Sequence, residues 1–211
     1  MATRKEAKST YVKVLGAGPG HYSYFTLKLI EEVKVADYVI GDRRILENLR
    51  ALTDAELIYL RSDSEFYRQI EEANKLEGTK VFLSTGDPML AGLGKVIKTP
   101  YVEPGVSSVQ LCASRLGEKL DDSAIISLRY ENNADKVSKA LGLGLGAYVL
   151  PNPYHSVGEN VRNLIAHGVR PDAEVGVCVD LSLPTEKVIR GTASELTSLD
   201  LKGLAVIFVK P

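Results

Sequence analysis

Short apolar runs recur along the chain, and most are followed by stretches in which apolar residues return at helical spacing. Such runs are typical of buried strands, and the longer period is typical of helices with one buried face. For the first half, the pattern predicts strands at residues 11–15, 38–40, 57–60, 81–83 and 101–102. Between and after them it predicts helices at residues 24–33, 46–49, 62–74, 88–96 and 108–116. Strands that alternate with helices predict a parallel sheet.

The second half has a different pattern. It predicts strands at residues 124–128, 148–150, 174–180, 187–190 and 204–209, with helices at 133–141, after Ser156 and after Thr192. The strands on either side of Leu183-Pro184 resemble an antiparallel hairpin. A polar stretch at 115–122 is the candidate linker. The predicted fold class is therefore α/β, with two α/β lobes and mixed sheets: an N-terminal lobe at 10–116 and a C-terminal lobe at 122–211.

Three turns of small residues follow predicted strands of the first lobe. They are Gly16–Gly20, Ser84–Pro88 and Pro104–Ser108. Small residues allow sharp turning and leave backbone N–H groups free. In a parallel sheet the turns after the strands open at one edge, where open α/β sheets bind ligands. The turns therefore predict a ligand site, with Asp87 as its carboxylate.

The first of these turns also resembles part of a dinucleotide-binding fingerprint. Gly16 and Gly18 fit the spacing, but His21 stands where the third glycine belongs, and Pro19 lacks an N–H group. Asp42 follows the second strand, where a ribose-binding acid would lie. The glycines alone leave a generic nucleotide-binding or methyl-donor fold open.

Composition narrows the function classes. The net charge is −1, from 26 basic and 27 acidic residues, which gives no overall attraction to nucleic acid or to a membrane. No apolar run approaches the ~20 residues of a membrane span. The charged first ten residues do not resemble a secretory signal. Cys112 and Cys178 lie in separate segments, which fits a reducing, cytoplasmic compartment, and the helical spacing of Cys112 predicts a packed thiol there. The three histidines show no metal-ligand spacing, so no metal is expected.

With these motifs in order, the chain resembles the tetrapyrrole methylases, which use S-adenosylmethionine. The segments that carry the resemblance are Gly16-Ala-Gly-Pro-Gly20, Phe25-Thr26, Ala36-Asp-Tyr-Val-Ile40, Thr85-Gly-Asp-Pro-Met89, Pro104-Gly-Val-Ser-Ser108 and Arg190-Gly-Thr192. The length, and Gly41-Asp-Arg-Arg44 followed by Leu46, most resemble the cobalamin-pathway members that methylate carbon 5 of precorrin-7 or its cobalt form.

The resemblance implies that S-adenosylmethionine binds in a cleft between the lobes. The donor-binding residues that it implies are Pro19, Thr85, Gly86, Asp87, Leu90, Ser107, Ser108, Leu150 and Leu181. The substrate carries many carboxylates, so its candidate partners are Arg43, Arg44, Arg129, His21 and Tyr130. Alignment of carbon, methyl and sulfur suffices for the transfer, so no general base is nominated. The resemblance also implies a homodimer.

Three alternatives remain at this point. In the first, the chain is a methylase of the same fold that acts at another ring position. In the second, it is a methylase of this fold that acts on RNA or protein. The net charge of −1 argues against RNA, because RNA methylases are expected to carry a strongly basic surface. The third alternative is a non-catalytic nucleotide-binding module, which Asp42 favours and His21 disfavours.

Overall fold

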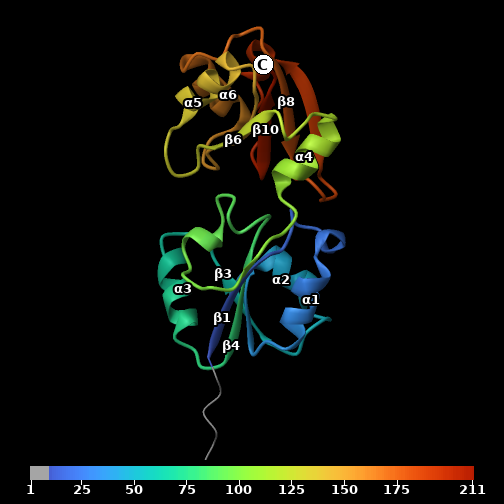
Figure 1. The fold of residues 1–211 in the computed structure, drawn as a ribbon, viewed down its shortest axis with the longest axis vertical. Helices are drawn as coiled ribbons and strands as arrows, with labels where there is room; N and C mark the ends of the chain where they lie inside the picture. Colours follow the sequence, from blue (N-terminus) through green and yellow to red (C-terminus); the bar gives the residue numbers. More distant parts are fainter. Residues whose placement is uncertain (1–9) are drawn as a thin grey trace, which may run out of the picture. The chain divides into compact units, whose positions relative to one another are not determined.

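The computed structural model of the protein describes residues 10–211. It divides into two compact units, with the boundary between Ser107 and Ser108 (Figure 1). The charged segment at residues 1–9 lies outside the described residues. Within the part described, no helix is both long enough and apolar enough to cross a membrane.

The first unit is built on a five-stranded sheet with the order β3-β2-β4-β1-β5, and all neighbouring strands are parallel. Its strands are β1 (Tyr11–Gly16), β2 (Tyr38–Asp42), β3 (Glu56–Leu60), β4 (Thr79–Ser84) and β5 (Val102–Glu103). Its helices are η1 (Tyr22–Tyr24), α1 (Leu27–Lys34), α2 (Arg43–Leu49), α3 (Phe66–Asn74) and η2 (Leu93–Lys95). The α/β prediction is confirmed, although this sheet is wholly parallel and not mixed.

Helices cover both faces of this sheet, so its strands read as continuous apolar runs. Successive residues of a strand point to opposite faces. Leu15 and Leu83 accordingly pack in the core beneath α1 and α2, while Val14 and Phe82 pack in the core beneath α3 (Figure 1). Helices therefore pack on both faces of the sheet, and the turns at its carboxyl edge are available for other contacts.

Two predicted features of this unit are wrong. The segment after Pro88 does not continue as a helix through Val96, and only the short η2 forms there. In place of a helical hydrogen bond, the Leu93 amide of this segment donates to the Ser84 hydroxyl at 3.1 Å. The sequence pattern of Ser62 followed by Glu65 also predicts a capping box, but α3 begins at Phe66 without a side-chain cap.

The second unit is built on a five-stranded sheet with the order β6-β7-β10-β8-β9. Its strands are β6 (Ser123–Ser127), β7 (Gly146–Leu150), β8 (Glu174–Val179), β9 (Lys187–Thr192) and β10 (Ala205–Val209). Its helices are α4 (Ser108–Leu116), α5 (Ala134–Gly142), α6 (Val157–Ala166) and α7 (Ala193–Leu196). This sheet is mixed, as predicted, with β6 and β7 parallel and β8 and β9 antiparallel.

Helix α4 belongs to the second unit, although the sequence prediction placed it in the first lobe and set a linker after it. It packs against β8 and β10. The Arg190 guanidinium donates to the Leu116 carbonyl oxygen at 2.5 Å, and the Leu116 side chain covers Gly176. These contacts fix the end of the helix to the sheet, so the polar stretch that follows is a connection inside the unit.

The prediction that Cys112 is a packed free thiol is also wrong. Cys112 on α4 and Cys178 on β8 form a disulfide, with their Cα atoms 5.8 Å apart. Both residues are fully buried. They are 66 residues apart in sequence, and only the packing of α4 on β8 brings them together. The cysteines therefore no longer support the expected reducing compartment.

Tyr148 is expected to limit the stability of the second unit. Its side chain is fully buried against Phe208, and within the described chain its hydroxyl has no hydrogen-bond partner. Burial raises the pKa of this hydroxyl to about 12. Removing a buried, unsatisfied hydroxyl relieves a cost of about 1–3 kcal/mol, so Tyr148→Phe should stabilise the protein by about 1 kcal/mol in urea unfolding. Tyr59→Phe is the control, because the Tyr59 hydroxyl bonds Glu47 and its loss should not stabilise.

Candidate functional site

The three glycine turns of the first unit meet at the carboxyl edge of its sheet. A Cβ atom added to Gly16 would lie 2.4 Å from the Gly105 amide nitrogen and 2.7 Å from the Gly86 carbonyl oxygen. A Cβ atom added to Gly105 would lie 2.6 Å from the same Gly86 oxygen. The backbones of three turns far apart in sequence are therefore in direct contact, which only glycine allows here.

Hydrogen bonds join the same turns. The Gly86 amide donates to the Gly18 carbonyl oxygen at 2.7 Å, and both glycines have positive φ angles, of 70° and 68°. The Asp87 carboxylate accepts from the amide of Met89 at 2.8 Å and from that of Gly105 at 3.3 Å. Both carboxylate oxygens of Asp87 are thus used to hold the turns, so this residue positions the site as well as facing it.

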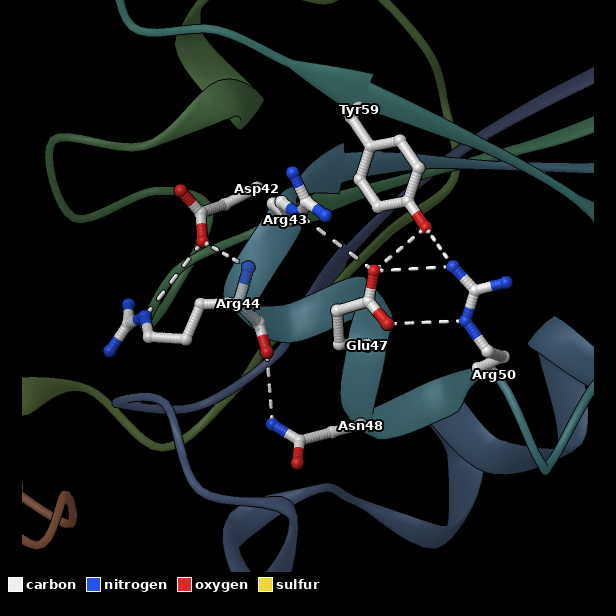
Figure 2. A network of polar contacts seen from close by, with 7 residues as sticks. All are labelled: Asp42, Arg43, Arg44, Glu47, Asn48, Arg50 and Tyr59. Carbon is white, nitrogen blue, oxygen red and sulfur yellow. Dashed lines mark hydrogen bonds and ion pairs between the residues drawn. The ribbon is translucent and has the colours of Figure 1, made fainter.

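Helix α2, whose polar side chains are drawn in Figure 2, contacts the first turn. The Arg44 guanidinium lies 3.5 Å from the Pro19 carbonyl oxygen, and the Asn48 amide lies 3.4 Å from that of Gly20. Asp42 caps the helix by accepting from the Arg44 amide at 2.9 Å, and its carboxylate lies 3.8 Å from the Arg44 guanidinium. Asp42 is therefore a helix cap, and Asn48 is a supporting residue that sequence reasoning missed because an exposed helical Asn carries no distinct signal.

Arg43 and Arg44, predicted as a pair, have different surroundings. The Arg43 side chain is 82% exposed, with its guanidinium 3.8 Å from Glu47 and over the ring of Tyr59 (Figure 2). The Arg44 side chain is 30% exposed and reaches the glycine turn. Exposed ion pairs such as that between Arg43 and Glu47 contribute little to stability. Arg44 thus has a positioning contact that Arg43 lacks.

Arg44→Ala is expected to weaken binding of S-adenosylhomocysteine by about threefold to tenfold. The loss of the hydrogen bond from Arg44 to the Pro19 carbonyl oxygen is worth about 0.5–1.5 kcal/mol. Arg43→Ala is the matched control, and its affinity should stay within twofold of wild type. Isothermal titration calorimetry measures both, and equal effects of the two substitutions would contradict the positioning role of Arg44.

In the second unit, two predicted donor residues lie at one edge of the sheet. Leu150 ends β7, and Leu181 follows β8. Both strands run antiparallel to β10, so their carboxyl ends lie on the same side. Both side chains are buried, and the Leu150 carbonyl oxygen accepts from the Leu128 amide at 2.8 Å. The two positions are therefore held by the sheet itself.

Backbone strain lies next to the predicted donor residues of both units. The non-glycine residues with positive φ in the described chain are Ala91, Asp180 and Ser182, at 53°, 51° and 70°. Ala91 follows Leu90, and the other two flank Leu181. Such conformations cost about 1–3 kcal/mol each and gather at ligand clamps and active sites. Ala91 carries no signal in the sequence, because alanine has no preference for this conformation.

The remaining predicted residues are placed as follows. Thr85 is exposed at the turn, Leu90 is half-buried, and Ser107 and Ser108 are buried and half-buried at the start of α4. The His21 imidazole accepts from the Ser23 amide at 3.3 Å and lies against Tyr22. Tyr130 is 64% exposed. Arg129 is half-buried in a pocket of the second unit. The structure thus gathers Pro19, Gly86 and Asp87 with the third turn, while Arg129 and Tyr130 lie in the other unit.

The parallel sheet with three joined glycine turns, followed by a mixed sheet, defines a class of methyltransferases. The chain belongs to the tetrapyrrole (corrin/porphyrin) methylases, whose family profile matches residues 12–197. The family takes its methyl group from S-adenosylmethionine, so the chain is an S-adenosylmethionine-dependent methyltransferase. The alternative of a non-catalytic nucleotide-binding module is thereby set aside.

Individual relatives cover nearly the whole chain. A probable cobalt-precorrin-7 C(5)-methyltransferase from Methanocaldococcus jannaschii is 29% identical over 92% of this chain and 95% of its own length. A uroporphyrinogen-III C-methyltransferase from Methanobacterium ivanovii is 25% identical over 94% of this chain and 96% of its own. The solved uroporphyrin-III C-methyltransferase of Thermus thermophilus, complexed with S-adenosylhomocysteine, superposes with a TM-score of 0.73 over 94% and 96% of the two chains, at 23% identity.

The residues at the glycine turns fit a methyl donor. Contacts between glycine backbones hold the turns together, which leaves the exposed Thr85 hydroxyl and the half-buried Leu90 side chain at the edge. A hydroxyl and an apolar side chain among fixed backbone groups suit a ligand with both ribose and apolar parts.

Proposed function

We propose that this chain methylates carbon 5 of precorrin-7 or of cobalt-precorrin-7. The observation that carries the proposal is the likeness to the Methanocaldococcus jannaschii relative, which spans both chains almost end to end. The segment Gly41-Asp-Arg-Arg44 supports it through the family resemblance. In the structure this segment forms the end of β2 and the start of α2, directly beside the first glycine turn.

For donor binding we propose residues of the turns and of the sheet edge of the second unit: Pro19, Thr85, Gly86, Asp87, Leu90, Ser107, Ser108, Leu150 and Leu181. Asp87 and Arg44 would hold the turns in place, and Thr85 and Leu90 would contact the donor. When bound, S-adenosylmethionine supplies an electrophilic methyl group on a positively charged sulfur. The chain's own contribution is then to align the attacking carbon with that methyl group and to exclude water, which can supply a large part of the rate enhancement.

The experiment offers the protein S-adenosylmethionine together with precorrin-7, cobalt-precorrin-7 or uroporphyrinogen III. Mass spectrometry counts the methyl groups added, and NMR of a ¹³C-methyl product locates them. The proposal expects one methyl group at carbon 5 of a precorrin-7. Methylation of uroporphyrinogen III alone would overturn it and would favour the second candidate, which the Methanobacterium ivanovii relative supports.

The homodimer remains a prediction. Its support is the family resemblance, and static light scattering of the full chain would test it. A monomer at the concentration of the activity assay would contradict it.

A further inference from the structure

The second unit contains a pocket of about 430 Å³ at the carboxyl ends of two parallel strands. Leu128, just beyond β6, and Asn152, just beyond β7, line one side, and Glu159 and Arg162 of α6 line another. The outer carboxyl ends of parallel strands are where α/β sheets commonly bind ligands. Leu150, a proposed donor residue, lies two positions before Asn152 in the same strand and turn. The pocket therefore has the location of a ligand site.

Most polar groups of the pocket already bind one another. The side-chain amides of Asn132 and Asn163 donate to each other at 3.3 and 3.0 Å. The Asn152 side chain accepts from the Tyr154 amide at 3.0 Å, and the Glu159 carboxylate accepts from the Ser156 amide at 2.6 Å. The Arg162 guanidinium donates to the carbonyl oxygen of Thr197. These partners lie within the unit, so they need no ligand.

Arg129 is different from these neighbours. Its Nε–H group is buried, and nothing in the described part of the chain accepts a hydrogen bond from it. Burial lowers the pKa of this guanidinium, which shows that its charge is poorly solvated. A buried donor without an acceptor is costly, and more so when it is charged, and buried charges are normally paired. The Arg129 side chain lines the pocket, so a ligand bound in the pocket would lie against it.

The charges around the pocket indicate what kind of acceptor fits. Arg129 and Arg162 line it together with Glu131 and Glu159, so its formal charges balance. A highly charged phosphate or a nucleic acid would meet the two carboxylates. A single carboxylate matches the planar guanidinium fork and needs only one cation.

We propose that this pocket binds one carboxylate side arm of the tetrapyrrole substrate through Arg129, and so sets which edge of the ring faces the methyl donor. The proposal rests on the proposed function for its substrate class. It makes Arg129 a specificity-determining residue with no part in donor binding. Its neighbours Asn132 and Asn163 then form a fixed wall beside the carboxylate.

The first test compares Arg129→Met and Arg129→Lys with Arg170→Met in the full chain. Arg170 is a matched control in the same unit, exposed and paired with Asp172. Arg129→Met should raise the KM for cobalt-precorrin-7 at least tenfold and leave S-adenosylhomocysteine affinity within twofold of wild type. Arg129→Lys, which keeps the charge, should recover part of the loss, and Arg170→Met should change neither value. An unchanged KM in a folded Arg129→Met variant would overturn the proposal.

The second test does not depend on activity. In protein with ¹⁵N-labelled arginine, the Nε–H resonance that disappears in Arg129→Lys should shift on addition of sodium acetate. Sodium chloride at equal ionic strength should not shift it. Absence of an acetate-specific shift would overturn the carboxylate site. If wild-type protein methylates no tetrapyrrole, the proposed function fails, and the acetate titration still decides whether the pocket binds a carboxylate.

Discussion

Gly16→Ala is expected to abolish S-adenosylhomocysteine binding and to destabilise the protein by about 1–3 kcal/mol or more. The new methyl group would lie 2.4 Å from the Gly105 amide nitrogen and 2.7 Å from the Gly86 oxygen, and backbone atoms cannot move aside as a flexible side chain can. The three turns would have to separate, and the proposed donor residues Thr85, Gly86 and Asp87 would move with them. Calorimetry with S-adenosylhomocysteine and urea unfolding measure the two effects.

Gly142→Ala is the matched control for that substitution. Gly142 is the last residue of α5, and a Cβ atom there would meet nothing within 4 Å. Its donor affinity should equal wild type, and its stability should be unchanged or slightly raised by the better helix propensity of alanine. Wild-type donor affinity in Gly16→Ala would show that the joined turns do not form the donor site.

A second large effect is expected from acid, through Glu32 on α1. Its side chain is 9% exposed and is surrounded by partners. The Lys13 and Lys28 ammonium groups donate to it, Lys28 at 2.8 Å, and the Tyr101 hydroxyl donates at 2.6 Å. Burial alone would raise the pKa of this carboxyl, but the three hydrogen bonds outweigh burial and lower it from 4.5 to about 2. The folded state therefore favours the ionised carboxylate.

A pKa lowered by folding gives stability that is present above pH 4.5 and is lost as the pH falls toward 2. We expect this one group to remove roughly 1–3 kcal/mol of unfolding free energy across that range, since solvent at the half-exposed Lys28 weakens the pair. Glu32→Gln should be less stable at pH 7 and should lose less stability on acidification. Glu31→Gln, an exposed position on the same helix, is the control. Equal acid slopes for wild type and Glu32→Gln would contradict the assignment.

Much of the fold could be predicted because its signals are local. The buried strands of the first unit read as apolar runs, since helices cover both faces of the sheet. Ser156 and Thr192 are each followed three residues later by a glutamate, a pattern that predicts capping boxes, and both capping boxes are present. The turn at residues 84–88 could also be located, because Gly86 permits a positive φ and Pro88 fixes its own φ.

The rest depends on contacts between distant segments. The absent helix after Pro88 shows this, because the Ser84 hydroxyl binds the Leu93 amide that the helix would have used. The disulfide between Cys112 and Cys178 exists only through the packing of α4 on β8. Arg43 and Arg44 are neighbours in sequence, but the helix turns one to solvent and the other to the glycine turn. Spacing along the chain carries none of this information.

The boundary at residue 107 has a consequence for synthesis of the protein. All five strands of the parallel sheet, and the glycines at 16, 86 and 105 where the three turns touch, lie in one continuous stretch before Ser108. A growing chain emerges from its N-terminus, and domains generally fold as units in that order. The edge strand β5 pairs directly with β1, so release of residues 102–103 from the ribosome supplies the last strand of this sheet. The joined turns can therefore form during translation, before β6 to β10 have been made.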